Sequence, residues 1–271
     1  MKYTKNTKNI LYLILIISFI VLLSVLLIKN NYKSNSKFNS KSNSNTNKIY
    51  IFWTGGYDST FRICQALIDE GKVVQPIYIS DIIDNLPENN VRRKNKTFEY
   101  TAMNNIITHL NTFYPETKNR LLPLIDIKNI VVDKNISYHM RILKSQGRVR
   151  RAVCQYGAMA QVTKNMKQNI EICVENEPGS MMNKTMNGKL DCLTNGESIV
   201  CNLKNDLKGD DIHLNIFKQF IFSTIKYTKK DMLNIAKKNG YDNILKLTWS
   251  CWYPVNGKPC GQCIMCHERI I

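Results

Sequence analysis

The longest apolar run of the chain lies near its N-terminus. Residues 10–28 form a stretch of 19 residues without a charge, interrupted only by Tyr12, Ser18 and Ser24. At about 1.5 Å per residue, a helix of this length can span a hydrocarbon core of roughly 30 Å. A secretory signal peptide has a shorter apolar centre and a small-residue cleavage site, whereas Lys29 follows this run directly. The pattern therefore favours a transmembrane helix over a cleaved signal peptide.

Polar segments flank this run on both sides. Residues 1–9 form a short basic N-terminus, and residues 29–47 are rich in Ser, Asn and Lys. The second segment has too few apolar residues to offset its ordering entropy, so we expect a flexible linker. Lysines are slightly more numerous after the apolar run than before it, which predicts that the C-terminal side faces the cytosol. The sequence thus predicts a single-pass membrane protein whose catalytic part begins near Lys48 on the cytosolic side.

Beyond the linker, short apolar runs alternate with segments of helical periodicity. Apolar residues that follow one another without a break indicate buried strands, and those spaced three or four residues apart indicate helices. Strands are predicted at residues 49–53, 73–79, 121–132, 170–174 and 220–222, and helices at residues 60–70, 92–110, 149–167 and 229–239. This alternation predicts an α/β fold with a mostly parallel sheet and helices on both faces.

The last of these helices has the clearest boundaries. Thr228 and Asp231 have the spacing of a capping box, in which each side chain bonds to a backbone N–H at the helix start. Gly240 is placed to end the helix in a left-handed conformation. Both ends of the predicted helix are therefore specified by the local sequence.

A glycine-rich loop joins the first predicted strand to the helix after it. The loop reads Thr54-Gly55-Gly56-Tyr57-Asp58-Ser59. Glycines permit positive φ and close approach to a ligand, and a helix start offers N–H groups and a positive dipole end to an anion. The hydroxyls of Thr54, Ser59 and Thr60 add donors. The loop therefore suits pyrophosphate binding, although an ordinary tight turn has a similar composition. It matches neither the Walker nor the dinucleotide-binding glycine pattern.

Four of the nine cysteines crowd the C-terminus. Cys251, Cys260, Cys263 and Cys266 stand in the pattern C-x8-C-x2-C-x2-C. Thiolates at these spacings can converge on one tetrahedral ion, and four sulfur ligands leave no position for water, which predicts a structural Zn²⁺ without catalytic chemistry. An iron–sulfur cluster, c-type haem attachment through the C-x-x-C-H ending at His267, and two disulfides are the alternatives.

The remaining candidates carry weaker signals. Cys192 and Cys201 flank Asn195-Gly196, a hairpin-turn signal, and could face each other, but they and the other cysteines outside the C-terminal four, Cys64, Cys154 and Cys173, are interpreted as buried or idle thiols. Glu99 could face a nucleotide, although a solvated helix face is the simpler interpretation. Arg148, Arg150 and Arg151 could bind a carboxylate or phosphate or line a solvated helix start. His109, His139 and His213 have no metal-ligand spacing and are interpreted as structural or exposed.

Charge is distributed unevenly along the chain. The net charge is +17, but residues 1–48 hold eight lysines and no acidic residue, so nearly half of the excess belongs to the N-terminal segments. The charge of the whole chain is therefore not a nucleic-acid footprint. The rest is still basic enough to favour an anionic partner such as a nucleotide, a phosphate or RNA, and direct nucleic-acid binding is not the favoured reading.

The glycine-rich loop and the four cysteines together resemble the 7-cyano-7-deazaguanine synthase family of the PP-loop (N-type ATP pyrophosphatase) superfamily. The resemblance covers residues 48–80 and 217–270. The residues that carry it are Phe52-Trp53-Thr54-Gly55-Gly56-Tyr57-Asp58-Ser59-Thr60, Thr228-Lys229-Lys230-Asp231-Met232, Thr248-Trp249-Ser250-Cys251, Pro259-Cys260-Gly261-Gln262-Cys263, Cys266 and Arg269.

The resemblance implies an adenine nucleotide alpha hydrolase-like domain over residues 48–247 and a zinc-binding segment over residues 248–271. It also implies ATP-dependent conversion of a 7-carboxy-7-deazaguanine and ammonia to a nitrile, a step of queuosine-type biosynthesis. A carboxylate is a poor electrophile, and transfer of AMP to it creates a leaving group that ammonia can displace; a second activation then dehydrates the amide.

The implied site is the glycine-rich loop with its neighbours. Residues 53–60 would bind ATP with Mg²⁺, Asp58 and Ser59 would be catalytic, and positioning and electrostatics would supply most of the catalysis. The resemblance also allows a homodimer. The alternatives are another PP-loop ATPase acting on a nucleobase or tRNA, and a non-catalytic zinc-stabilised homologue.

Overall fold

A computed structural model describes residues 47–83, 95–150 and 155–267 of the chain. The predicted N-terminus, transmembrane helix and linker over residues 1–9, 10–28 and 29–47 lie outside these ranges apart from Asn47. Within the described ranges, no helix combines the length and the apolar character that a membrane span requires.

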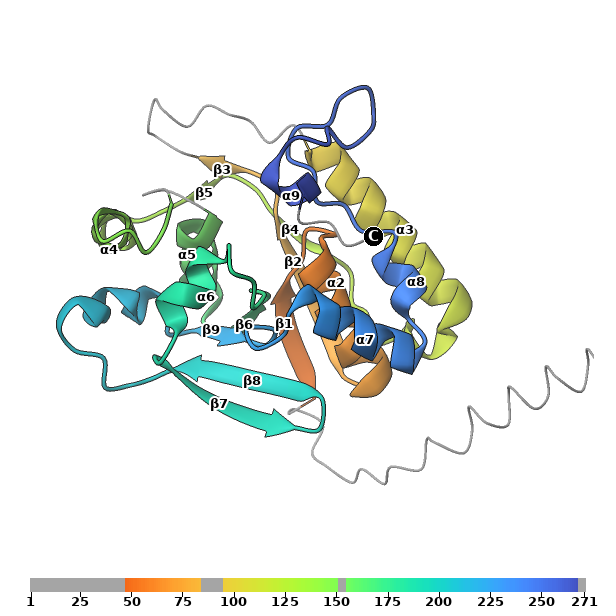
Figure 1. The fold of residues 1–271 in the computed structure, drawn as a ribbon, viewed down its shortest axis with the longest axis horizontal. Coiled ribbons are helices and arrows are strands. Elements are labelled where there is room, and N and C mark those ends of the chain that lie inside the picture. The colour runs from red at the N-terminus through yellow and green to blue at the C-terminus, as the bar shows by residue number, and fades with distance from the viewer. Residues whose placement is uncertain (1–46, 84–94, 151–154, 268–271) are drawn as a thin grey trace, which may run out of the picture. The chain divides into compact units, whose positions relative to one another are not determined.

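A seven-stranded sheet runs through the folded body in the order β4-β2-β1-β6-β9-β8-β7 (Figure 1). The first five strands in that order are parallel, and β8 is antiparallel to both of its neighbours. The prediction of an α/β fold with a mostly parallel sheet is confirmed. The strands are β1 (Lys48–Phe52), β2 (Val73–Ile79), β4 (Ile125–Ile127), β6 (Ile170–Ile172), β7 (Leu190–Asn195), β8 (Ser198–Leu203) and β9 (Phe220–Phe222).

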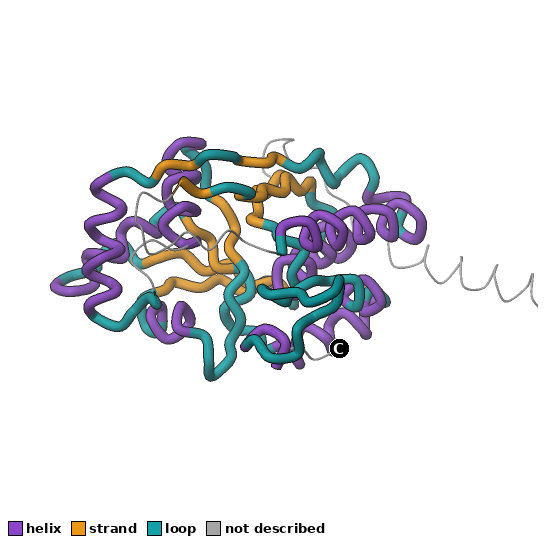
Figure 2. The backbone as a smooth tube through the Cα atoms, turned by 90° about the horizontal axis from the view of Figure 1, so that it is seen from above, coloured by secondary structure: helices purple, strands orange, loops and turns teal. Residues whose placement is uncertain are grey.

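Helices cover both faces of this sheet, as the view from above shows (Figure 2). One face carries α2 (Tyr57–Cys64), its π-helical continuation η1 (Gln65–Asp69), α3 (Lys96–Phe113), α7 (Lys229–Asn239) and α8 (Asp242–Leu245). The other face carries α4 (Lys134–Ser145), α5 (Gln155–Met166), α6 (Met181–Met186) and the 3-10 helix η4 (Gly209–Phe217). Short elements complete the body: η3 (Pro115–Thr117), α9 (Ile264–His267) and a two-stranded sheet of β3 (Ile82–Ile83) and β5 (Ile130–Val131).

The central strand β1 shows why an unbroken apolar run predicts a strand here. Alternate side chains of a strand point to opposite faces of the sheet. Ile51 and, just after the strand, Trp53 pack into the core under α2 and α3, whereas Phe52 packs into the core under α4 and α5. Because helices cover both faces, the four strand positions after the exposed Lys48 are all apolar.

The predicted ends of helices and strands agree best with the structure where the local sequence contains a strong capping or turn signal. Thr228 and Asp231 form the predicted capping box, and Gly240 ends α7 with a φ of 83°. The segment 121–132, predicted as one interrupted strand, divides into β4 in the main sheet and β5 in the small one. Helix α4 was not predicted, although Asp133 caps it by accepting a hydrogen bond from the Ile136 N–H at 2.8 Å.

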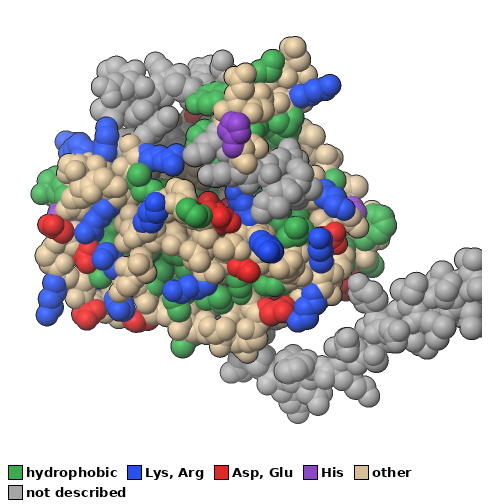
Figure 3. All heavy atoms as spheres, in the orientation of Figure 1, with side chains coloured by type: hydrophobic (Ala, Val, Ile, Leu, Met, Phe, Trp, Pro, Cys, Tyr) green, Lys and Arg blue, Asp and Glu red, His purple; other side chains and the backbone are tan. Residues whose placement is uncertain are grey.

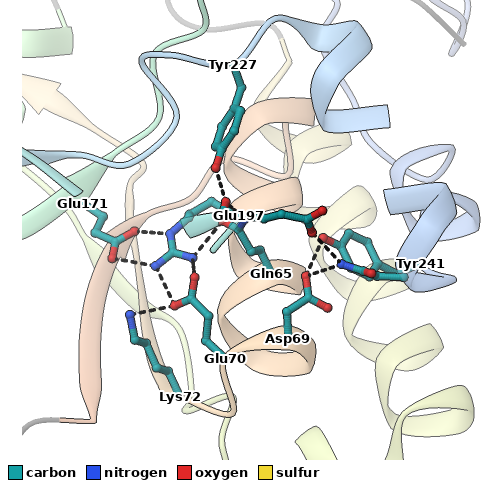
Figure 4. Close-up of polar contacts among 10 residues, drawn as sticks. Gln65, Asp69, Glu70, Lys72, Glu171, Glu197, Tyr227 and Tyr241 are labelled. Atoms are coloured by element: carbon teal, nitrogen blue, oxygen red, sulfur yellow. Dashed lines mark hydrogen bonds and ion pairs between the residues drawn. The ribbon is translucent and has the colours of Figure 1, made fainter. Parts of the chain in front are cut away.

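A buried ionic network holds α2 against the sheet (Figure 4). Arg62 of α2 is fully buried. Its Nε lies 2.6 Å from Glu171 Oε2 on β6, and its Nη1 lies 2.6 Å from Glu70 Oε1. Nη1 also donates to Gln65 Oε1 at 3.0 Å. A guanidinium with carboxylates on two sides satisfies its donors without water, and the network fixes the helix that follows the glycine-rich loop.

Glu70 provides a pH-dependent test of this network. Burial opposes ionisation of Glu70, but hydrogen bonds from Arg62 outweigh it and lower the pKa of Glu70 to about 2. A depressed pKa stabilises the fold above the unfolded-state pKa, and this contribution is lost as the pH falls through the folded-state value. We expect Glu70→Gln to cost about 2 kcal/mol at pH 7. Urea unfolding should show that the difference in free energy of unfolding between wild type and variant narrows from pH 7 to pH 3.5. A constant difference would contradict the lowered pKa of Glu70.

Candidate functional site

The glycine-rich loop lies where the sheet changes its direction of winding. β1 pairs with β2 on one side and with β6 on the other. From β1 the chain runs outward to β2 and β4 and then returns to β6 on the opposite side of β1. In open α/β sheets, ligands bind outside the carboxyl ends of the strands at such a switch point. The loop after β1 and the segment after β6 therefore meet at the expected place for a ligand.

Gly55 is the glycine that the loop conformation requires. Its φ is +70°, a value that side chains rarely adopt. A Cβ at Gly55 would also lie 3.0 Å from the Glu99 carbonyl oxygen and 3.2 Å from Met103 Cγ. The Gly55 carbonyl accepts a hydrogen bond from the Trp249 N–H at 2.9 Å. The loop is thus packed closely against α3 and tied to the C-terminal segment.

Helix α2 begins without a side-chain cap. Gly56 occupies the N-cap position and has no side chain to accept a capping hydrogen bond from the first N–H groups. The first N–H groups of a helix have no partner within the helix, so this helix start can donate to an anion. Ser59 is half-buried, and its Oγ donates to the Gly56 carbonyl at 3.4 Å.

Two residues predicted to bind the nucleotide have structural partners instead of open faces. Trp53 and Thr60 are both fully buried, and Trp53 Nε1 donates to Thr60 Oγ1 at 3.0 Å. This bond ties the end of β1 to the first turn of α2. The half-buried residues of the loop, which a ligand could reach, are Thr54, Gly56, Tyr57, Asp58 and Ser59.

A narrow pocket of about 10 Å³ opens beside the loop, at the carboxyl ends of β1 and β2. Its walls are mainly apolar, with the polar groups of Thr54 and Gln155 among them. The lining residues are Phe52, Trp53, Thr54, Ile77, Ile79, Gln155 and Met159. A pocket of this volume holds about one water molecule, so a nucleotide base would enter only if the lining side chains moved.

An acidic pair stands at the mouth of the switch point. Asp58 hydrogen-bonds to Glu175, from the segment after β6, while Asp58 Oδ1 is buried and without a partner among the described residues. Burial, and next the charge and hydrogen bond of Glu175, raise the pKa of Asp58 well above its usual range, against the opposing charge of Lys229. Two such carboxyl groups share a proton or bind a cation. Sequence reasoning missed Glu175, and it named Lys229 only as part of the segment that carries the resemblance, because neither residue belongs to the loop motif.

The C-terminal cysteines form a cluster that could hold a metal ion such as zinc. The ligand atoms of Cys251, Cys260, Cys263 and Cys266 all lie within 4.8 Å of one another. Cys266 Sγ is 3.9 Å from Cys260 Sγ and 3.5 Å from Cys263 Sγ. Four sulfur ligands about 2.3 Å from one tetrahedral ion lie about 3.8 Å apart. The predicted grouping of these four residues is confirmed.

Backbone donors favour the thiolate form of Cys260 in this cysteine cluster, whereas burial raises the pKa of Cys251 and of Cys266. The Cys260 N–H donates to Cys251 Sγ at 3.2 Å, and the Cys263 N–H donates to Cys260 Sγ at 3.4 Å. N–H groups of Gln262 and Cys263 lower the pKa of Cys260 to about 6. All four cysteines are unpaired by disulfides, so the two-disulfide alternative is wrong for this structure. The meeting of all four sulfurs also leaves the c-type haem pattern without support.

The cysteine cluster adjoins the glycine-rich loop. Besides its bond to Gly55, Trp249 stacks on Phe98 of α3, with ring centroids 4.6 Å apart. Ser250 Oγ donates to the Met265 carbonyl at 3.3 Å, which links the two ends of the cluster. A metal held there would therefore also fix one wall of the loop.

The weaker candidates have structural partners. Glu99 is buried and accepts hydrogen bonds from Asn95 Nδ2 at 2.9 Å and from the Tyr78 hydroxyl, so the solvated-face interpretation was wrong. His139 and His213 contact each other through their Nδ1 atoms at 2.9 Å. Among the arginine candidates, Arg148 pairs with Asp211 at 2.6 Å, and Arg150 is exposed. Arg151 and Cys154 lie outside the described residues.

One cysteine expectation is overturned. Cys192 and Cys201, interpreted as idle thiols, are opposite partners on β7 and β8 and form a disulfide. The hairpin turn between them is the one that the sequence indicated. Directly opposed positions of a hairpin bring side chains together, so the turn signal could have predicted the bond.

On the face drawn in Figure 3, the surface charges of the described residues form no continuous basic patch that would mark a polymer-binding site. On the side seen in Figure 3, Lys and Arg side chains are interspersed with Asp and Glu over the folded body. Recognition of a nucleic-acid backbone usually depends on a basic patch or stripe. The surface in this view is compatible with a small anionic ligand.

Comparison with known proteins assigns neither a family nor a function to this chain. No family model matches the sequence, and no curated protein matches it. Neither comparison bears on the resemblance to PP-loop enzymes.

Proposed function

We propose that this protein binds ATP at the glycine-rich loop and acts as a carbon–nitrogen ligase similar to 7-cyano-7-deazaguanine synthase. The observation that carries the proposal is the position of the loop at the carboxyl end of β1, at the switch point of the sheet. The uncapped start of α2 supports it, since its N–H groups and dipole favour phosphate oxygens. An adenine nucleotide alpha hydrolase-like fold would place ATP in the same position.

The acidic pair suits the Mg²⁺ that accompanies ATP. Mg²⁺ binds through one or two carboxylates together with the phosphates of the nucleotide. Asp58 and Glu175 would supply those carboxylates, and the unpartnered Oδ1 of Asp58 fits this role. ATP would supply an AMP group that turns a carboxylate into an electrophile. The loop N–H groups would orient the phosphates and stabilise the negative charge of the departing pyrophosphate.

The other parts of the chain would support this reaction indirectly. Zinc at the cysteine cluster would be structural and would hold Trp249 against the loop. The apolar run at residues 10–28 would tether the enzyme to a membrane with its catalytic domain in the cytosol, where ATP is available.

Nucleotide binding is tested first, by thermal unfolding of the full chain with Mg·ATP. A ligand that binds only the native state stabilises it by about 2.7 kcal/mol at 100 times its Kd. We expect Asp58→Asn and Gly56→Ala to lose most of this stabilisation, because one removes a cation ligand and the other places a methyl group at the helix start. Asp81→Asn, at an exposed position after β2, is the matched control and should respond like wild type.

Turnover is tested next, with 7-carboxy-7-deazaguanine, ammonia and Mg·ATP. Wild type should release pyrophosphate and form the nitrile, and Asp58→Asn should be inactive. ATP use with another carboxylate or with a tRNA, but not with this substrate, would favour a different PP-loop enzyme. If Mg·ATP leaves the unfolding temperature unchanged, the ligase proposal fails and a non-catalytic zinc-stabilised protein is favoured.

A further inference from the structure

The hairpin of β7 and β8 carries a disulfide that the proposed ligase chemistry does not use. Cys192 and Cys201 are bonded across the hairpin. Cys192 is exposed on β7, the strand at one edge of the seven-stranded sheet, whereas Cys201 is fully buried on β8. A thiol in solution can therefore reach the disulfide from the side of Cys192.

The tip of this hairpin is docked on η1, on α7 and on Tyr227 just before α7 (Figure 4). The Glu197 carbonyl accepts hydrogen bonds from Gln65 Nε2 at 2.8 Å and from the Tyr227 hydroxyl. The Glu197 carboxylate lies 2.6 Å from Lys238 Nζ of α7. With Asn239 Nδ2, which donates to the Glu197 carboxylate at 3.4 Å, four side chains contact this one turn residue, so the positions of the hairpin tip and of η1 depend on each other.

Gln65 continues this connection into α2. Its Oε1 accepts a hydrogen bond from Arg62 Nη1 at 3.0 Å, and its side chain is buried. Arg62 belongs to the eight-residue helix that starts at the glycine-rich loop. Two side chains thus link the hairpin tip to the helix that presents the loop.

We propose that the Cys192–Cys201 disulfide is a thiol–disulfide switch that sets how firmly the hairpin tip holds η1 and α2. The bond closes a chain segment with a sequence separation of 9 residues, and cross-linking restricts the conformations that such a segment can adopt. Reduction would leave β7, an edge strand with one sheet neighbour among the described strands, joined to the sheet only by its ladder to β8, with Leu190 at its start still packed against the core. The hydrogen bond between Gln65 Nε2 and the Glu197 carbonyl at the hairpin tip would then break more often.

The chemical step is ordinary thiol–disulfide exchange with a dithiol reductant. A thiolate of the reductant attacks Cys192 Sγ, the bond between the two sulfurs breaks, and Cys201 leaves as a thiolate that takes up a proton. The second thiol of the reductant then displaces Cys192, which also takes up a proton, and the reductant ends as a disulfide. Two electrons pass to the cysteine pair, and a disulfide oxidant reverses the reaction.

The other cysteines that the structure describes do not compete for this exchange. Cys64 is fully buried and Cys173 is half-buried, and burial raises the pKa of both thiols above their usual range. Thiols of raised pKa are poor nucleophiles because the thiolate is the reactive form. Zinc would occupy the four thiols of the cysteine cluster.

The test measures amide hydrogen exchange of the full, zinc-loaded chain in detergent, after treatment with oxidised or reduced dithiothreitol and without nucleotide. Peptide mass spectrometry after differential alkylation reports the state of Cys192 and Cys201. We expect reduction to speed exchange about tenfold in residues 190–203 and in residues 62–69. The double variant Cys192→Ser/Cys201→Ser should exchange like the reduced protein in both buffers.

Gln65→Leu separates a switch from a merely local disulfide. In this variant, reduction should still loosen residues 190–203 but should no longer change residues 62–69. The proposal is overturned if no oxidant joins Cys192 to Cys201, or if exchange in residues 62–69 of the wild type is the same in both redox states. Because no nucleotide is present, either result is independent of the proposed ligase activity.

Discussion

Cys260→Ser is expected to abolish metal binding and to destabilise the folded body by about 4 kcal/mol or more. Serine keeps the shape of cysteine but not the soft thiolate that zinc prefers. Cys260 is central to the cluster, because its sulfur accepts the Cys263 N–H and lies 3.9 Å from Cys266 Sγ. Loss of the ion would free the segment that ties Trp249 to Gly55.

This prediction is measured by metal analysis and thermal unfolding of the same preparations. Wild type should hold about one zinc per chain, and the variant almost none. A loss of 4 kcal/mol should lower the Tm by about 10 °C for a body of this size. Cys173→Ser, a half-buried cysteine outside the cluster, is the control and should retain the metal. Retention of zinc by Cys260→Ser, or an unchanged Tm without metal, would refute the structural role. If purified wild type is coloured and contains iron, the four cysteines hold an iron–sulfur cluster instead of zinc.

Local sequence signals account for the features that were predicted correctly. The apolar run before Thr54, the capping box at Thr228 and the cysteine spacing each specify a structure within about ten residues, so no knowledge of distant segments was needed. Helix α4 had a signal of the same kind, since Ile136, Met140 and Leu143 are buried at helical spacing behind a capping Asp133. That helix could have been found by the reasoning that found α7.

The features that were missed depend on contacts between distant parts of the chain. Glu175 meets Asp58 only because β6 returns beside β1, and the Glu99 side chain is buried where α3 meets Tyr78 of β2, whose hydroxyl donates to it. A single sequence shows the polarity of such residues but not which neighbours will cover them. For the same reason, Arg62 gave no sign that it would be buried between two acidic residues.

Arg62→Ala is the second change with a large expected effect, a loss of about 3–5 kcal/mol of stability, because removing one partner leaves buried charge uncompensated. The side chains of Glu171 and Glu70 are only 3% and 14% exposed, so water cannot replace the guanidinium. Arg62→Lys should lose less stability than Arg62→Ala, because lysine keeps the positive charge. It should still lose some, because lysine lacks the planar fork that reaches both carboxylates.

Urea unfolding at pH 7 measures these losses, and a second substitution identifies their cause. If the cost of Arg62→Ala comes from unpaired carboxylates, then Arg62→Met combined with Glu171→Met should recover much of it, because an apolar pair leaves one fewer charge buried. If the cost comes instead from the cavity left by the side chain, Arg62→Met alone should recover as much as the double variant. A loss below about 1 kcal/mol for Arg62→Ala would mean that the network contributes no more than a surface ion pair, and the fixed position of α2 behind the loop would then need another source.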